Sequence, residues 1–271
     1  MNPAPQPGPL GIAAVWDAIA GGYARDVTPF FARYGEEALR LVAVDRSAHV
    51  LDVAAGPGTM TFLLAPRVAR VSAIDFSPKM IEELRARADR ESVGNVDARL
   101  MDAQALTFAD STFDAAFCLF AFMFFPDRGR AFGEMLRVLR PGGQALVATW
   151  APIERRPFIR IGIEAMAEAF PEVPRMQKGD LQQPEACIAE MTAAGFGDVT
   201  TQSVTSSLRV DSADHYLQIM ERSGPGFAAL RQKFGDKWPE AKNRLLDAVR
   251  CRMPAGGAEL SAEAILSVGR R

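Results

Sequence analysis

Short apolar segments alternate with helical segments between residues 49 and 150, and this alternation limits the possible folds more than any other feature of the chain. The first strand-like run is HVLDVA, the fifth is QALVATW, and the runs are apolar along most of their length, as in strands buried on both faces of a sheet. Two later runs, DVTTQSVTSSLRV and ELSAEAILSVGRR, bring the expected strands to seven. Because right-handed helical crossovers join parallel strands, the sequence predicts an α/β fold with a doubly wound, mostly parallel sheet and helices on both faces.

The segments outside the alternating region indicate elements around this sheet. Residues 1–10 are expected to be a flexible leader, and residues 11–45 have apolar positions at helical spacing, which predicts a helical N-terminal cap. Residues 46–271 then form the main domain, in which 151–182 and 211–253 are expected to be helical lid elements near the substrate.

The composition restricts the classes of partner. The chain of 271 residues has 31 basic and 33 acidic side chains, and this balance lacks the positive field that a nucleic-acid partner requires. Three scattered cysteines without metal-ligand spacing indicate no metal site and a reducing, cytoplasmic location. The longest apolar run, AAFCLFAFMFFP, is shorter than the roughly 20 residues of a membrane-spanning helix, so we expect no membrane partner. The composition leaves the oligomeric state open.

A glycine-rich turn follows the first expected strand. In VLDVAAGPGTMT, Gly56 and Gly58 permit a sharp turn and a close approach of the backbone to a ligand, although a plain tight turn would use the same residues. The second strand ends in Asp75, where doubly wound folds place a carboxylate for ribose hydroxyls. Asp52 and Asp102 also lie at or near the carboxyl ends of expected strands, so we expect acidic groups to gather at the ligand-binding edge.

Four motifs occur in order along the chain, namely VLDVAAGPG, AIDFSPKMI, LMDAQALTFADSTFDAAF and EMLRVLRPGGQALVATW. Together they resemble the class I S-adenosylmethionine-dependent methyltransferases, especially the ubiquinone/menaquinone-biosynthesis-like (methyltransferase type 11) branch, over about residues 16–150. The resemblance implies a Rossmann-like fold, S-adenosylmethionine as the cofactor, and transfer of its methyl group to a small-molecule acceptor by in-line SN2 displacement.

The same resemblance implies a set of cofactor-binding residues. The loop after the first strand holds the methionine part, the acid ending the second strand binds the ribose, the acid after the third strand faces adenine, and an N-terminal tyrosine in WDAIAGGY closes over the cofactor. The residues at these and the adjoining positions are Tyr23, Asp52, Ala54, Gly56, Gly58, Asp75, Phe76, Asp102, Ala103, Leu119 and Phe120.

The sequence offers few candidates for a general base. His49 begins a strand, which favours a structural role, whereas His215 lies on an expected lid helix. His215 and Tyr23 are therefore the two catalytic candidates, although a solvated helix position and a packing role account for them equally well. Methyl transfer chiefly requires alignment of the nucleophile, the methyl group and the leaving sulfur, so the chemistry does not demand a base from the protein.

Aromatic residues after the fourth strand indicate where the acceptor binds. The run FAFMFFPD contains Phe124, which we expect to line an apolar substrate pocket together with Trp150 and Tyr216. Core packing of alternate members of this run is the other interpretation. The expected acceptor is a small apolar or aromatic metabolite.

Two other functions share parts of this pattern. An NAD(P)-dependent oxidoreductase also uses a glycine turn and an acidic strand end, but Thr61 replaces the third small residue of the dinucleotide fingerprint and the chain has no Tyr-xxx-Lys pair. A non-catalytic module that binds S-adenosylmethionine would retain the same cofactor residues, and turnover distinguishes it from an enzyme.

Overall fold

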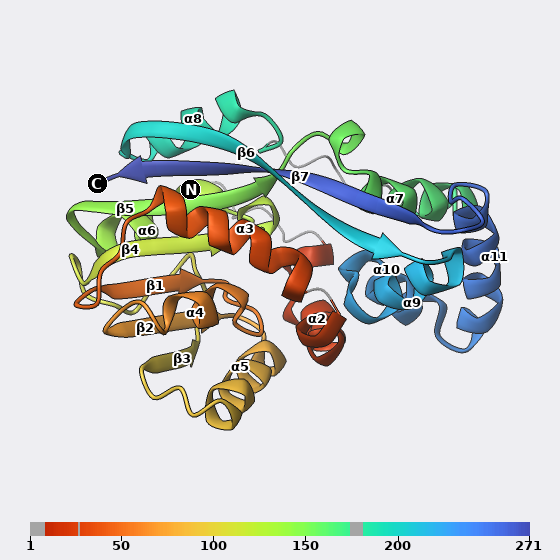
Figure 1. Cartoon of the computed structure of the whole chain (residues 1–271), viewed down its shortest axis with the longest axis horizontal. Coiled ribbons are helices and arrows are strands. Elements are labelled where there is room, and N and C mark those ends of the chain that lie inside the picture. Colours follow the sequence, from red (N-terminus) through yellow and green to blue (C-terminus); the bar gives the residue numbers. More distant parts are fainter. Residues whose placement is uncertain (1–8, 27, 174–180) are drawn as a thin grey trace, which may run out of the picture.

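The computed structural model describes residues 9–26, 28–173 and 181–271, which are built around one seven-stranded sheet (Figure 1). Its strand order is β3-β2-β1-β4-β5-β7-β6, in which β3 to β5 are parallel and β7 is antiparallel to both of its neighbours. This order confirms the predicted α/β, mostly parallel sheet. The strands are β1 (His49–Val53), β2 (Arg70–Asp75), β3 (Val96–Leu100), β4 (Phe113–Leu119), β5 (Leu139–Trp150), β6 (Gly197–Val210) and β7 (Ala258–Arg270).

Helices lie before and between the strands, and α5 shows why they begin where they do. Ser77 is its N-cap, the Ser77 Oγ accepts the N–H of Met80, and Pro78 occupies the first turn, where proline fits a helix. The α-helices are α1 (Ala13–Asp17), α2 (Ala20–Asp26), α3 (Thr28–Leu41), α4 (Thr59–Leu64), α5 (Pro78–Arg90), α6 (Arg128–Val138), α7 (Pro157–Ala169), α8 (Pro184–Ala193), α9 (Ala213–Ser223), α10 (Pro225–Phe234) and α11 (Trp238–Arg250). Short 3-10 segments are η1 (Pro9–Gly11), η2 (Phe122–Phe124), η3 (Ile153–Arg155) and η4 (Gly235–Lys237).

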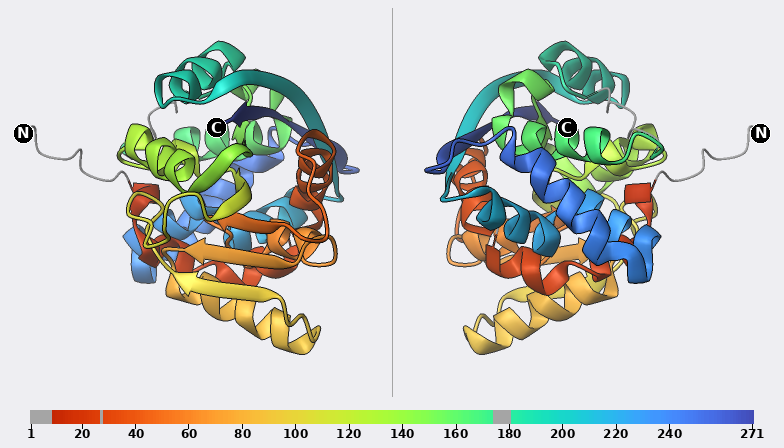
Figure 2. Two further views of the ribbon diagram at one scale, coloured as in Figure 1. Left: turned by 90° about the vertical axis from the view of Figure 1, so that its left-hand side faces the viewer. Right: turned by 90° about the vertical axis from the view of Figure 1, so that its right-hand side faces the viewer.

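The central strands β1, β2 and β4 are buried on both faces, because successive strand residues point to opposite sides and helices cover each side. On β1, Val50 joins the core beneath α3 and α4, whereas Leu51 joins the core beneath α6 and α8. Figure 2 shows α3 and α6 on opposite sides of the sheet. The two cores hold the strands rigidly, so the loops at their carboxyl ends are well positioned. The switch in strand order between β1 and β4 places the ligand-binding crevice at this edge.

The β6–β7 pair extends beyond the rest of the sheet. β7 pairs with β6 along its whole length but with β5 only from Ala264 onward. Helices α7, α9, α10 and α11 surround this extension (Figure 1), and the Oη of Tyr216 on α9 donates to the carbonyl of Phe158 on α7 at 2.7 Å. The first segment expected to form a lid element contains η3 and α7, the second contains α9, α10, η4 and α11, and residues 174–180 of the first lie outside the described residues. Their role as lids stays a prediction.

The N-terminal segment is helical as well. α3 packs on the sheet, whereas α1 and α2 contact α5 and the carboxyl edge. Residues 1–8 of the expected leader lie outside the described residues, and Leu10 at its end is buried beside Val15. In the described part of the chain, no helix combines the length and the apolar character needed to cross a membrane.

Candidate cofactor and acceptor site

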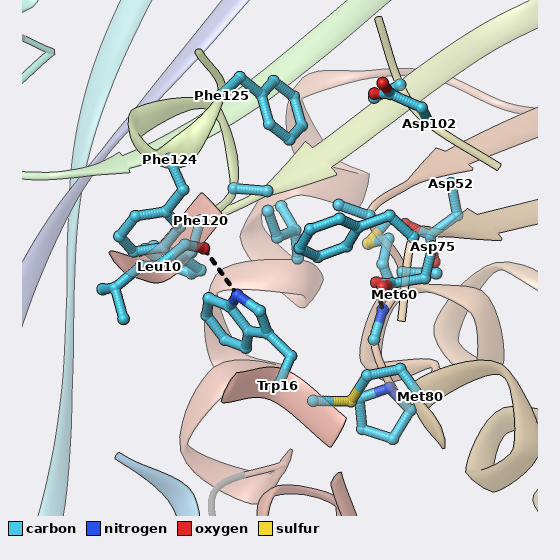
Figure 3. Close-up of a pocket in the computed structure, with 18 of the residues that line it drawn as sticks. Leu10, Trp16, Asp52, Met60, Asp75, Met80, Asp102, Phe120, Phe124 and Phe125 are labelled. Carbon is cyan, nitrogen blue, oxygen red and sulfur yellow. Dashed lines mark hydrogen bonds between the residues drawn. The ribbon is translucent and has the colours of Figure 1, made fainter. Parts of the chain in front are cut away.

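A cavity of about 330 Å³ lies at the carboxyl ends of β1, β2 and β4. The loops after these strands form its floor and walls, and the chain from η1 to α3 covers it. In Figure 3, Asp52, Asp75 and Asp102 lie on one side of the cavity, and the aromatic rings of Phe124 and Phe125 lie on the other. The cavity therefore has an acidic half and an aromatic half.

The loop between β1 and α4 forms one edge of the cavity. Ala54, Gly56 and Gly58 all have positive φ angles, of 53°, 55° and 94°, so this short loop turns sharply into the N-terminus of α4. A Cβ atom on Gly58 would lie 2.6 Å from Cε2 of Phe62, so only glycine fits this position without displacing the ring. Ala54 also has a left-handed conformation, which is sterically unfavourable for a residue with a Cβ atom. The family that the sequence resembles often has glycine at this position.

The carboxylate of Asp75 joins this loop to the end of β2. Its Oδ2 accepts the N–H of Gly56 at 2.8 Å, and its Oδ1 accepts the N–H of Ser77 at 2.9 Å. Burial raises the pKa of Asp75 to about 6, although these backbone donors favour the ionised form. The carboxylate is held in one orientation and retains lone pairs that can accept hydrogen bonds from ribose hydroxyls.

The second acidic group, Asp52, lies one residue before the end of β1. Its Oδ2 accepts the Oγ1–H of Thr61 at 2.5 Å, and burial raises its pKa to about 7, with a further contribution from the nearby charge of Asp75. A cation bound in the cavity would offset the cost of ionising both buried carboxylates.

The third acidic group, Asp102, lies just after β3. Its Oδ1 accepts the N–H of Gln104 at 2.9 Å, and the Gln104 Oε1 accepts the N–H of Asp127 at 2.8 Å. These bonds connect the loop after β3 to the start of α6 and set the position of Asp102 at the cavity.

Aromatic side chains form the other half of the cavity. Phe120, directly after β4, has a left-handed backbone conformation with a φ of 62°. Its ring stacks on Trp150 at the end of β5, with ring centroids 4.1 Å apart. Phe31 lies 5.0 Å from Phe120 and stacks on Tyr23 at 5.5 Å, both between ring centroids. This continuous aromatic surface is suited to an apolar, flat molecule or to a cation over a ring face.

Tyr23 brings a hydroxyl group to this aromatic surface, because its ring stacks on Phe31 and lines the cavity. Burial and the charge of Asp75 raise the pKa of Tyr23, so the hydroxyl remains protonated at neutral pH. It forms no hydrogen bond with any other residue that the structure describes, and it is therefore a free donor at the cavity.

The charges around the cavity are all of one sign. No Lys, Arg or His is found among the described residues that line it, whereas three aspartates are. S-adenosylmethionine fits this set of acceptors because its sulfonium and ammonium groups are positively charged and its ribose hydroxyls and adenine amino group donate hydrogen bonds, and all of these pair with carboxylates. The buried carboxylates and the absence of a basic group here fit a pyrophosphate less well.

The structure brings most of the expected site residues together. Gly58 does not line the cavity; it is the N-cap residue of α4, at the end of the loop. The expected residues that line the cavity are Tyr23, Asp52, Ala54, Gly56, Asp75, Phe76, Asp102, Ala103, Leu119, Phe120 and Phe124.

Three expected residues lie elsewhere. Trp150 is behind Phe120 rather than at the cavity, and Tyr216 is fully buried in the core beneath α7. His215 is partly exposed on α9, where its Nδ1 accepts the N–H of Asp211 at 3.2 Å. None of the three lines the cavity.

The sequence interpretation missed several lining residues, among them Leu10, Trp16, Phe31, Met80 and Gln104. Trp16 and Phe31 stand at helical spacing in the N-terminal cap, so periodicity marks them as packing residues and gives no sign that they meet a ligand. Phe122 of the aromatic run lies beyond the end of β4 and stacks on Phe132 with ring centroids 4.0 Å apart, so this residue is part of the core.

Comparison with known proteins identifies the family. Residues 50–143 match the model of a methyltransferase domain. The chain is 36% identical over 194 residues to the demethylmenaquinone methyltransferase of Thermobifida fusca, covering 69% of this chain and 80% of that protein. It is 33% identical over 150 residues to the ubiquinone/menaquinone biosynthesis C-methyltransferase UbiE of Hydrogenovibrio crunogenus, covering 52% of this chain and 59% of that protein.

The fold agrees with this result. The crystal structure of the YcgJ protein from Bacillus subtilis superposes with a TM-score of 0.60 at 21% identity, covering 88% of this chain and 97% of that protein. The chain therefore belongs to the class I S-adenosylmethionine-dependent methyltransferases, in the branch of the ubiquinone and menaquinone biosynthesis enzymes. S-adenosylmethionine is the cofactor of this family.

Proposed function

We propose that this protein transfers the methyl group of S-adenosylmethionine to a small apolar or aromatic acceptor, and that the acceptor binds against the aromatic half of the cavity. The observation that carries the proposal is the division of one cavity into an acidic half and an aromatic half. The names of the relatives, which refer to quinone biosynthesis, support an aromatic acceptor.

The cofactor residues have distinct tasks in this proposal. Asp75 binds the ribose hydroxyls, Asp52 and the loop at Ala54 and Gly56 hold the methionine part, and Asp102 faces the adenine amino group. Each of these groups is fixed by hydrogen bonds or by the backbone conformation of the loop. The protein therefore binds the cofactor in one orientation with little reorganisation.

The cofactor, when bound, supplies an electrophilic methyl group on a positively charged sulfur. Phe120, Phe31 and Tyr23 would align the acceptor for in-line SN2 displacement, and they exclude water from the reacting atoms. The Tyr23 hydroxyl can donate a hydrogen bond to an oxygen of the acceptor but cannot remove a proton, because its pKa is raised. An acceptor that carries a proton on its nucleophilic atom must therefore lose this proton without help from Tyr23.

A labelling experiment tests the proposal. The protein is incubated with a small-molecule extract and methyl-deuterated S-adenosylmethionine, and mass spectrometry identifies metabolites that gain the label. The expected result is one aromatic or apolar product together with S-adenosylhomocysteine, and neither forms with Asp75→Ala. If S-adenosylhomocysteine binds but no metabolite gains the label, the chain is a binding module rather than an enzyme.

A further inference from the structure

Residues 9–26, which we call the roof, cover the cavity with η1, α1 and α2. Leu10, Trp16 and Tyr23 of the roof line the cavity, and the Trp16 Nε1 donates to the carbonyl of Leu10 at 2.8 Å (Figure 3). A ligand that fills the cavity contacts these residues. The position of the roof therefore affects how fast such a ligand leaves.

A small apolar cluster attaches part of the roof to the rest of the protein, while α2 also packs against α9 and its Tyr23 stacks on Phe31. Val15 and Ile19 of the roof are buried with Met80 of α5 and Ala228 of α10, and the Trp16 ring lies 5.5 Å from the Phe124 ring between centroids. This cluster is much smaller than the two cores on the faces of the sheet. Because stability differs across a structure and is lowest where few apolar groups are buried, the roof is expected to open more easily than the sheet.

Asp17, the last residue of α1, provides a polar attachment next to the cofactor site. Its Oδ1 accepts the Oγ–H of Ser77 at 2.5 Å and the N–H of Lys79 at 3.1 Å. Ser77 is fully buried, and its own N–H donates to Asp75 Oδ1. Ser77 thus forms hydrogen bonds with both Asp17 of the roof and Asp75, the carboxylate assigned to the ribose.

We propose that Asp17 is a positioning residue that latches the roof over the bound cofactor and slows its release. The two hydrogen bonds to Asp17 must break before the roof can move away from the N-terminus of α5. The proposal concerns how the cofactor is retained, so it rests on the S-adenosylmethionine site of the family and is independent of the acceptor's identity.

A purely structural role for Asp17 makes a different prediction. A carboxylate at the N-terminus of a helix stabilises the helix through its free N–H groups and its dipole, so its loss would lower the stability of the protein without changing ligand kinetics. A latch instead changes the rate of cofactor release. The two roles are distinguished by measuring both quantities on the same variants.

The experiment uses the full chain with S-adenosylhomocysteine as the probe. Its dissociation rate is measured by stopped-flow displacement for the wild type, Asp17→Ala and Asp17→Asn, and Asp89→Ala removes an exposed carboxylate of α5 as a matched control. We expect release about tenfold faster from Asp17→Ala, within about threefold of wild type from Asp17→Asn, whose amide oxygen still accepts both hydrogen bonds, and unchanged from the control.

A second measurement does not depend on any variant. Hydrogen exchange of the wild-type roof amides, for example those of Ala18 and Tyr23, should slow when S-adenosylhomocysteine binds. The proposal is overturned if Asp17→Ala releases the probe at the wild-type rate, or if the probe leaves exchange in the roof unchanged. Failure to find a methyl acceptor would leave both results intact and would count only against the proposed transfer.

Discussion

Asp75 accepts the backbone N–H of Gly56 through Oδ2 at 2.8 Å, and this hydrogen bond connects the ends of two neighbouring strands at the cavity. The bond fixes the glycine loop and the carboxylate relative to each other before any ligand binds. Because Ser77 occupies the other carboxylate oxygen, the orientation of Asp75 is determined by backbone groups on both sides. A site preorganised in this way loses little conformational entropy on binding.

The fit of the glycine loop is testable at Gly58. Gly58→Ala places a Cβ atom within 2.6 Å of Phe62 at a φ of 94°, so we expect it to lower the free energy of unfolding by about 1–3 kcal/mol. Urea denaturation measures this change. Gly94→Ala is the control, since no heavy atom lies within 4 Å of its new methyl group. Equal stability of the two variants would contradict the close approach.

The buried carboxylates predict a pH dependence of stability. Burial raises the pKa of Asp75 to about 6 and that of Asp52 to about 7, whereas both are near 4 in the unfolded chain. The folded state therefore binds more protons between about pH 4 and pH 7, and the contribution of these groups to stability falls as the pH rises through that range. Asp52→Asn should flatten the fall, as measured by denaturant unfolding at several pH values.

The same groups predict the opposite trend for the cofactor. Its positive charge favours ionised carboxylates, so the affinity for S-adenosylmethionine should rise between about pH 5.5 and pH 8. Titration calorimetry at fixed ionic strength measures this trend. An affinity that stays constant across this range would show that the carboxylates are already ionised in the free protein.

Tyr23 and Tyr216 are two phenols to compare, the first partly buried at the cavity and the second fully buried in the core. Tyr23→Phe should weaken binding of S-adenosylhomocysteine by roughly 3–10-fold with little loss of stability, because its hydroxyl has no partner among the described residues. Tyr216→Phe should instead lower stability by about 1 kcal/mol without changing affinity, because its hydroxyl donates to Phe158 inside the core. Calorimetry and thermal unfolding of both variants give the comparison, which fails if the two effects are reversed.

We expect His215 to play no part in methyl transfer. It lies on the exposed side of α9 beside Asp211 and does not line the cavity, so His215→Ala should retain the wild-type rate of methyl transfer once an acceptor is known. A steady-state rate assay decides the matter. A loss of 100-fold or more with unchanged cofactor affinity would restore His215 as a general base and require the lid helices to move.

The sequence predicts the sheet and the acidic edge well, because both depend on local patterns. Uniformly apolar runs identify the parallel strands, and Asp52, Asp75 and Asp102 stand where such strands end. The aromatic half is harder to predict, since it is assembled from distant segments. Phe31 meets Phe120 only through the packing of α3 on the sheet, and no sequence period relates them.

Tyr216 does not line the cavity as expected, and the sequence pattern explains why its position could not be predicted. Tyr216 is an aromatic residue on an amphipathic helix, and a helical period shows that it faces an apolar surface but not which one. The structure places that surface in the core beneath α7, next to the β6–β7 extension. The hydrogen bond between Asp17 and Ser77 also could not be predicted from local sequence patterns, because it joins residues 60 positions apart.

The proposed cofactor site depends on Asp75, the buried carboxylate that we assign to the ribose of S-adenosylmethionine. Titration calorimetry of S-adenosylhomocysteine into the wild type and Asp75→Ala tests it most directly. The account predicts saturable 1:1 binding to the wild type and a loss of about 100-fold or more in the variant, which removes a charged acceptor for two hydroxyls. Equal affinity of the two proteins would contradict it.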